Sequence, residues 1–325
     1  MKKFPVLLLA LTLVAGSLFA QPSGAMVTFG LISDTHVCDK SDQSVAIALN
    51  ASPRYFSGGL AKIEAFSMAM NAAGADFVAE LGDFTDNPAT PGLTPAQRRE
   101  TAMGFMRAAE TRFALFRGPR YHVFGNHDTD QAAKADFLSI VKNTDTASGA
   151  SYYSFDRGGV HFIVMDSSFR ANGASYSGIP GEPGSGYSWD DANIPAEEVA
   201  WLAADIAAAA APVVVLTHQQ LNGQELVDAA YDPKHSVRNA PVVRGVLEAS
   251  GKVLAVFGGH YHDGGYQEIG GINYIVLQAN AAYGNDVSYH NQYATVKIFS
   301  EGGKYTVSFS GNGMQRSYAF SKVLR

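Results

Sequence analysis

The chain has 325 residues, of which 46% are hydrophobic and 17% charged, and its formal net charge is −6. This composition is ordinary for a globular protein and excludes collagen-like, coiled-coil and disordered chains. The acidic balance argues against a nucleic-acid partner, which needs a basic surface. The single cysteine, Cys38, excludes an intrachain disulfide.

The N-terminus predicts a signal peptide over residues 1–25. Lys2 and Lys3 precede an apolar run at residues 6–15, and small residues follow up to Ala25. The run is shorter than the ~20 apolar residues that a membrane span needs, and cleavage is expected after Ala20 or Ala25. We therefore expect residues 26–325 to form one exported domain, periplasmic or secreted, that keeps no membrane span.

The first half of the chain alternates predicted strands with predicted helices. Apolar spacing and capping residues predict strands at 27–33, 76–81 and 121–124, and helices at 60–73, 94–116 and 129–141. Two alternating segments, 151–156 and 160–166, predict a hairpin around Arg157-Gly158-Gly159.

The second half is richer in strands. Helices are expected at 196–209 and 242–249, and strands at 212–217, 253–257, 267–269, 272–277, 293–300 and 304–310. The whole pattern predicts an α/β fold in which two packed sheets are flanked by helices. A stretch with five glycines and two prolines, residues 171–194, is expected to be a lid or a binding loop.

Five polar clusters stand where predicted strands end. They are Asp34-Thr35-His36, Gly82-Asp83-Phe84-Thr85-Asp86, Gly125-Asn126-His127-Asp128, Thr217-His218 and Gly258-Gly259-His260-Tyr261-His262. Each cluster alone could be an ordinary turn or helix cap. Because sites in α/β folds form at the carboxyl ends of strands, we expect the five to converge. Carboxylate and imidazole ligands without cysteine suit Mn, Fe or Zn.

In this order the clusters match the signature D-x-H, GD-x-x-D, GNH-[DE], H, GH-x-H, so the chain resembles the calcineurin-like metallophosphoesterases. It is most similar to their manganese-dependent ADP-ribose/CDP-alcohol diphosphatases, in stretches such as Arg54-Tyr55-Phe56, Tyr152-Tyr153-Ser154-Phe155 and Gly311-Asn312-Gly313. The resemblance implies that family's αββα fold. It also implies hydrolysis of a phosphodiester or pyrophosphate bond in a small, nucleotide-like substrate, with attack by a hydroxide that bridges two metal ions.

The resemblance also implies roles for single residues. The two divalent ions would be Mn, Fe or Zn, with Mn favoured. One would be held by Asp34, His36 and His262, the other by Asn126, His218 and His260, and Asp83 would bridge them. His127 would stabilise the oxyanion or protonate the leaving oxygen, and Asp86 would orient His127.

Several alternatives stay open at this stage. A phosphomonoesterase of alkaline-phosphatase type fits the same clusters, and a non-catalytic metal-binding protein is a further possibility. The pairing of His127 with Asp86 favours catalysis, because a metal store has no use for a histidine that is not a ligand. Asp128 either serves the site or caps the helix expected from residue 129. The exact substrate and the oligomeric state stay open.

Overall fold

The computed structural model of the protein describes residues 24–43, 53–147, 149–222, 235–314 and 316–324. Residues 1–23 of the predicted signal peptide lie outside the described residues. In the described part, no helix is both apolar enough and long enough to cross a lipid bilayer.

The strands form two mixed sheets of six strands each. The first contains β1 (Val27–Ile32), β2 (Phe77–Glu80), β3 (Arg120–His122), β10 (Tyr293–Glu301), β11 (Lys304–Asn312) and β12 (Ser317–Val323). Its order is β12-β11-β10-β1-β2-β3, and β1, β2 and β3 run parallel. These three strands therefore end at the same edge of the sheet.

The second sheet contains β4 (Tyr153–Arg157), β5 (Val160–Val164), β6 (Val213–Leu216), β7 (Val253–Gly258), β8 (Gly265–Ile269) and β9 (Ile272–Val276). Its order is β4-β5-β6-β7-β9-β8, with β5, β6, β7 and β9 parallel. The parallel strands β5, β6 and β7 are buried on both faces, which explains their nearly continuous apolar sequences.

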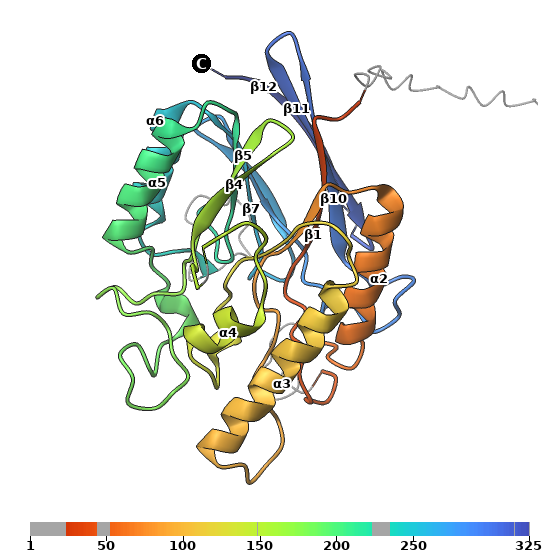
Figure 1. The fold of residues 1–325 in the computed structure, drawn as a ribbon, viewed down its shortest axis with the longest axis vertical. Coiled ribbons are helices and arrows are strands. Elements are labelled where there is room, and N and C mark those ends of the chain that lie inside the picture. The colour runs from red at the N-terminus through yellow and green to blue at the C-terminus, as the bar shows by residue number, and fades with distance from the viewer. Residues whose placement is uncertain (1–23, 44–52, 148, 223–234, 315, 325) are drawn as a thin grey trace, which may run out of the picture.

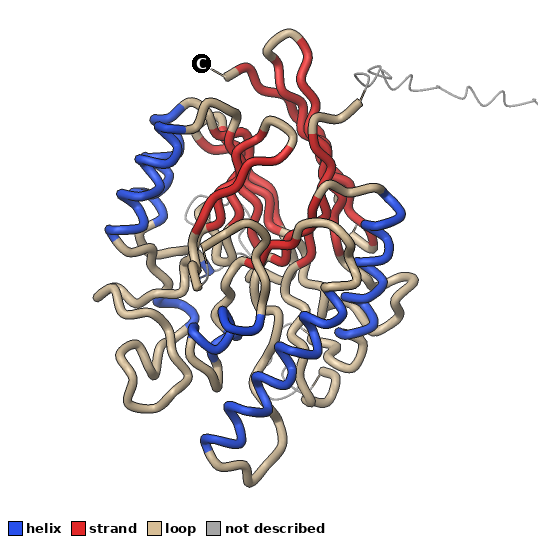
Figure 2. Tube along the Cα trace, viewed as in Figure 1, coloured by secondary structure: helices blue, strands red, loops and turns tan. Residues whose placement is uncertain are grey.

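Helices cover the outer face of each sheet, as Figure 1 shows. The first sheet packs against α2 (Gly59–Ala73), α3 (Pro95–Phe113) and α4 (Lys134–Ile140), and the second against α5 (Ala196–Ala208) and α6 (Ala240–Ser250). The predicted two-sheet sandwich flanked by helices is thereby confirmed. The loops that connect strands to helices gather at the lower end of the molecule in Figure 2.

Aromatic side chains from both sheets fill the space between them. Phe29 of β1 stacks on Phe77 of β2 with 4.8 Å between ring centroids, and it meets Phe162 of β5 edge-on at 5.3 Å. All three side chains are fully buried. This interface fixes how the two sheets lie relative to each other, and so it fixes which strand ends can meet.

One predicted helix begins later than expected, and one observed strand was not predicted. The helix expected at 129–141 begins only at Lys134, because His127–Thr129 form a single 3₁₀ turn and Asp136 caps the start by accepting from the Ala133 amide. Strand β12 was not predicted, although Tyr318 and Phe320 alternate there and pack on the core.

Candidate metal centre and active site

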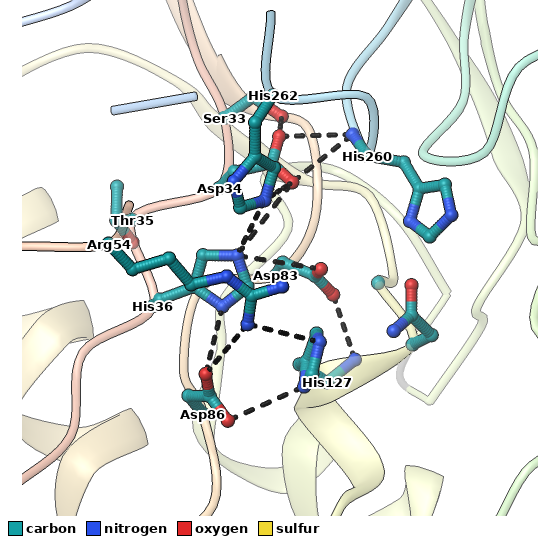
Figure 3. A network of polar contacts seen from close by, with 12 residues as sticks. Ser33, Asp34, Thr35, His36, Arg54, Asp83, Asp86, His127, His260 and His262 are labelled. Carbon is teal, nitrogen blue, oxygen red and sulfur yellow. Dashed lines mark hydrogen bonds and ion pairs between the residues drawn. The ribbon is translucent and has the colours of Figure 1, made fainter. Parts of the chain in front are cut away.

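Three predicted ligands from opposite ends of the chain form one compact group. Asp34 and His36 follow β1, and His262 follows β7. The Nε2 atoms of His36 and His262 lie 3.2 Å apart, and Oδ1 of Asp34 lies 3.9 Å from the first and 3.6 Å from the second. All three side chains are buried and point toward one another (Figure 3). Two imidazole nitrogens that face each other beside a carboxylate form a donor set for a divalent ion.

A second group lies beside the first. His218 follows β6, Asn126 follows β3, and His260 follows β7. Nε2 of His218 lies 3.2 Å from Oδ1 of Asn126, and His218 and His260 both have a ring nitrogen close to Asp83. Nε2 of the buried His260 has no hydrogen-bond partner among the residues that the structure describes. A buried polar atom left in this way fits a ligand that awaits a metal.

Asp83 lies between the two groups. Its Oδ1 is 3.2 Å from Nε2 of His218, and its Oδ2 is 3.8 Å from Nε2 of His36. The backbone N–H of His127 donates to Oδ1 at 2.8 Å and so fixes the carboxylate. Each oxygen of Asp83 thus faces one group, which is the arrangement that a bridging ligand needs.

Charge and burial favour the metal-binding forms of His260, His262 and Asp83, whereas Asp83 outweighs burial and raises the pKa of His218 to about 9. Burial lowers the pKa of His260 and of His262 well below the usual range, and the nearby Arg54 cation adds to this for His262. Burial alone would raise the pKa of Asp83, but His218 and His127 outweigh it and hold that pKa well below its usual range. Neutral imidazoles and an ionised carboxylate are the forms that coordinate metals.

The backbone at the site adopts an uncommon conformation. Asp34, His36, Asp83 and His260 have φ between 50° and 68°, the left-handed region that residues with a Cβ rarely enter. Gly259 approaches so closely that a Cβ there would lie 2.0 Å from Oγ of Ser33. Strain of this kind persists only where the surrounding structure enforces it, and it clusters at functional sites.

A second layer of contacts orients the predicted ligands. Nδ1–H of His218 donates to the carbonyl of Leu81 at 2.8 Å, which leaves Nε2 facing the centre. The amide of Gln219 donates to Oδ1 of Asn126 at 3.3 Å, and Gln219 is held in turn by Ser167. Gln219 and Ser167 were missed in the sequence, because nothing in their spacing indicates that their loops touch.

His127 lies beside the two groups without joining either. The structure brings Asp86 within 3.4 Å of its Nδ1, but Asp130 is closer, with an oxygen at 2.7 Å. Arg54 lies 3.5 Å from Nε2 of His127 (Figure 3). Burial lowers the pKa of His127, yet the carboxylates of Asp130, Asp86 and Asp83 outweigh burial and raise it well above the usual value. Asp130 was missed in the sequence, although a single turn places it at i+3 from His127.

Asp86 has more partners than the sequence predicts. Its carboxylate accepts from Lys40 at 2.6 Å and from Arg54 at 3.2 Å, and it lies 3.3 Å from Nδ1 of His36. Asp86 therefore links the predicted ligand His36 to the surface cations as well as to His127. Its position fits the orienting role that was predicted, but it shares that role with Asp130.

Asp128 neither caps a helix nor faces the metal groups. Its two oxygens accept from the backbone N–H groups of Thr85 and Gly125, each at 3.0 Å. It therefore ties the loop after β2 to the loop after β3. Cys38 is half-buried, and burial raises the pKa of its thiol to about 12, so it does not offer a thiolate ligand.

The loop 171–194 lies against the site. The hydroxyl of Tyr187 is 2.7 Å from the carbonyl of Asn126 and 3.2 Å from Oδ1 of Asp130, and its ring stacks on Tyr176 at 4.0 Å. A cavity of about 570 Å³ separates other parts of this loop from His127. The location fits the predicted binding loop, and its movement on ligand binding stays a prediction.

Histidines outside the motifs have other partners. His161 lies 2.8 Å from Asp156 and 2.9 Å from Asp205, and Nε2 of His122 lies 3.0 Å from a Glu110 oxygen. These contacts are consistent with structural roles. His235 has a ring contact with Trp189 at the edge of the cavity.

Known proteins resemble this chain in sequence and in fold. Manganese-dependent ADP-ribose/CDP-alcohol diphosphatases are 27% identical over 141 residues in Arabidopsis thaliana and 26% over 153 residues in Oryza sativa subsp. japonica. These matches cover 43% and 46% of this chain and only 40% and 44% of the relatives. The crystal structure of a dimetal phosphatase from Danio rerio superposes with a TM-score of 0.71 and 17% identity, over 93% of this chain and 99% of that one.

The family model described as calcineurin-like phosphoesterase matches residues 27–264. The match includes all five polar clusters and more than half of the chain. The chain therefore belongs to the calcineurin-like phosphoesterase family.

Proposed function

We propose that this protein is a hydrolase with two divalent metal ions, and that it cleaves a phosphodiester or diphosphate bond in a small, nucleotide-like substrate. The observation that carries the proposal is the position of Asp83, with one oxygen toward each of two buried ligand groups. Asp34, His36 and His262 would hold one ion, and Asn126, His218 and His260 the other. Two such ions activate water and neutralise the charge on phosphate oxygens.

The residues around the predicted ligands have their own tasks. His127 borders the cavity, and Asp130 accepts from its Nδ1, so its Nε2, which has the Arg54 guanidinium 3.5 Å away, would give a proton to the leaving oxygen. The guanidinium of Arg54 lies 3.2 Å from Asp86 and 3.5 Å from His127. From there a cation attracts a substrate phosphate and limits how far it can shift.

The substrate class is supported by the cavity beside His127. A volume of about 570 Å³ falls in the range of small-molecule sites and exceeds what a lone phosphate needs. This favours a substrate with a second group beyond the scissile bond over a simple monoester. The manganese-dependent relatives named above act on ADP-ribose and CDP-alcohols, which supports Mn²⁺ and a diphosphate for this chain.

The test compares three substrates on purified mature protein loaded with Mn²⁺. They are p-nitrophenyl phosphate, bis(p-nitrophenyl) phosphate and ADP-ribose. The proposal expects higher kcat/KM for the diester or for ADP-ribose than for the monoester. A clear preference for the monoester would make the protein a phosphomonoesterase. Metal binding without turnover of any substrate would make it a binding protein.

We also propose that the chain is exported. The support is the order of charged, apolar and small residues over positions 1–25. N-terminal sequencing of the protein recovered from a periplasmic or extracellular fraction should begin after Ala20 or Ala25. Recovery of the uncut chain from the cytoplasm would overturn this part.

A further inference from the structure

An exposed tryptophan stands at the edge of the cavity beside His127. Trp189 lines this cavity and is 39% exposed, whereas the other tryptophan, Trp201, packs against Tyr152 with 5.0 Å between ring centroids. The ring centroid of Trp189 lies only 5.6 Å from that of His260, a predicted metal ligand. The ring of His235 also contacts the indole, with 4.9 Å between centroids, and the exposed part of the indole is available to a molecule whose phosphate lies at the metal centre.

The backbone on both sides of Trp189 is fixed. Trp189–Asp191 form a 3₁₀ turn, and the guanidinium of Arg238 donates to the carbonyl of Asp190 at 2.7 Å. The hydroxyl of Tyr176 lies 3.1 Å from the carbonyl of Ser188 and 2.6 Å from Oδ1 of Asp191. The backbone that carries Trp189 is therefore held in place before a ligand arrives, which lowers the entropic cost of binding.

The cavity leaves room for an aromatic ring. Gly181 and Gly186 line it, and a Cβ at either position would meet no atom within 4 Å. Both have φ above 60°, so a side chain is disfavoured there as well. Neither position therefore places a side chain in the cavity.

We propose that this cavity binds the aromatic base of a nucleotide substrate, stacked on Trp189, and that Trp189 sets the preference for base-containing substrates. The inference rests on the proposed function, because it places the phosphate of the same molecule at the metal centre. Bases of any kind stack on an aromatic face, and loss of one such contact lowers affinity about 10- to 100-fold. Trp189 therefore selects for a base without selecting which base.

The first test is fluorescence, which requires no turnover. The chain has only two tryptophans, so Trp201→Phe leaves Trp189 as the sole one and Trp189→Phe leaves Trp201. AMP should change the emission of the Trp201→Phe protein and not that of the Trp189→Phe protein. Ribose 5-phosphate, which lacks the base, should have little effect on either. An equal response of both proteins to AMP, or no response, would overturn the inference.

The second test compares two esters with the same leaving group, thymidine 5′-(p-nitrophenyl phosphate) and methyl p-nitrophenyl phosphate. Trp189→Ala should lower kcat/KM for the thymidine ester about 10- to 100-fold more than for the methyl ester. Trp189→Phe keeps an aromatic face and should retain most of the preference. Trp201→Phe is the matched control and should behave as the wild type.

The two tests separate this inference from the proposed function. If neither ester nor ADP-ribose is hydrolysed, the proposed function fails, while the fluorescence response to AMP still decides the role of Trp189. If both esters are hydrolysed and Trp189→Ala affects them equally, the proposed function stands and base stacking on Trp189 is wrong.

Discussion

Replacement of His127 by alanine separates chemistry from metal binding. His127 lies beside the predicted ligand Asn126, but its ring nitrogens face Asp130 and Arg54, and its ring lies edge-on to that of the predicted ligand His36 with 5.0 Å between centroids. His127→Ala should therefore keep both metal ions and lower kcat. The backbone N–H that fixes Asp83 is also retained, because the substitution changes only the side chain.

The size of the expected loss in kcat follows from the charge of the His127 imidazole and from its exposure to solvent. The side chain of His127 is 22% exposed, so an effective dielectric constant of about 20 is appropriate. A cationic imidazole about 4 Å from a developing oxyanion then contributes about 4 kcal/mol, which corresponds to about a 10³-fold change in rate. Proton transfer by a positioned side chain typically contributes 10²–10⁴-fold, so both routes give the same range.

The assay measures kcat on diesters of p-nitrophenol and of an alkyl alcohol, together with metal content by elemental analysis. Nitrophenolate leaves without a proton, so its ester should lose less activity than the alkyl ester. Asp130→Asn should reproduce part of the defect, and more of it than Asp86→Asn, because Asp130 is the closer partner of Nδ1. His161→Ala, far from the motifs, is the control.

Three results would refute this reasoning. Loss of metal in His127→Ala would make His127 a support of the metal centre. Near-normal turnover of the alkyl ester would remove His127 from the chemistry. Equal losses for both leaving groups would exclude proton donation and leave electrostatic stabilisation of the oxyanion as its role.

Three further predictions concern other parts of the site and fold. Asp83→Ala should reduce the metal content from about two ions per chain to nearly none, and loss of one ion alone would exclude a bridging role. Tyr187→Phe removes a hydroxyl that contacts Asn126 and Asp130. The substitution should lower the free energy of local opening of this loop by about 0.5–1.5 kcal/mol. The measurement is amide hydrogen exchange, which should become faster in residues 177–191. Burial lowers the pKa of His161, but Asp205 and Asp156 outweigh burial and raise it. Protonated His161 therefore stabilises the folded state fully below its unfolded pKa of about 6.5. This stabilisation is lost as the pH rises through the higher pKa of the folded state. In urea unfolding, His161→Asn should therefore lose more stability at about pH 5 than at about pH 9; an equal loss would refute the coupling.

The sequence indicates the sheets and helices well because their periodicity is local. Alternation and short apolar runs mark most strands, and Thr94 with Pro95 marks the start of α3, where the structure adds a capping box between Thr94 and Gln97. The late start of α4 was missed because the polar turn after Asn126 reads like the first turn of a helix. Its true beginning is set by the contact of Asp136 with Ala133.

The strand ends predicted that the five polar clusters converge, and the resemblance to a family signature named the ligands among them. Their supporting residues could not be named in the same way. Gln219 orients Asn126 across 93 residues of sequence, and Tyr187 reaches the same residue from a loop without regular structure. Such contacts depend on how loops fold over the sheet edge, and residue spacing carries no information on that.

Each predicted ion would be held from both sheets. The first sheet supplies Asp34 and His36 to one group and Asn126 to the other, while the second sheet supplies His262 to the first group and His218 with His260 to the other. Each ion would thus act as a cross-link between the two layers, in a chain that has no disulfide to do so. A ligand that binds only the folded state stabilises that state. Removal of the metal ions by a chelator should therefore weaken the packing between the two sheets first and leave the strand pairs within each sheet intact.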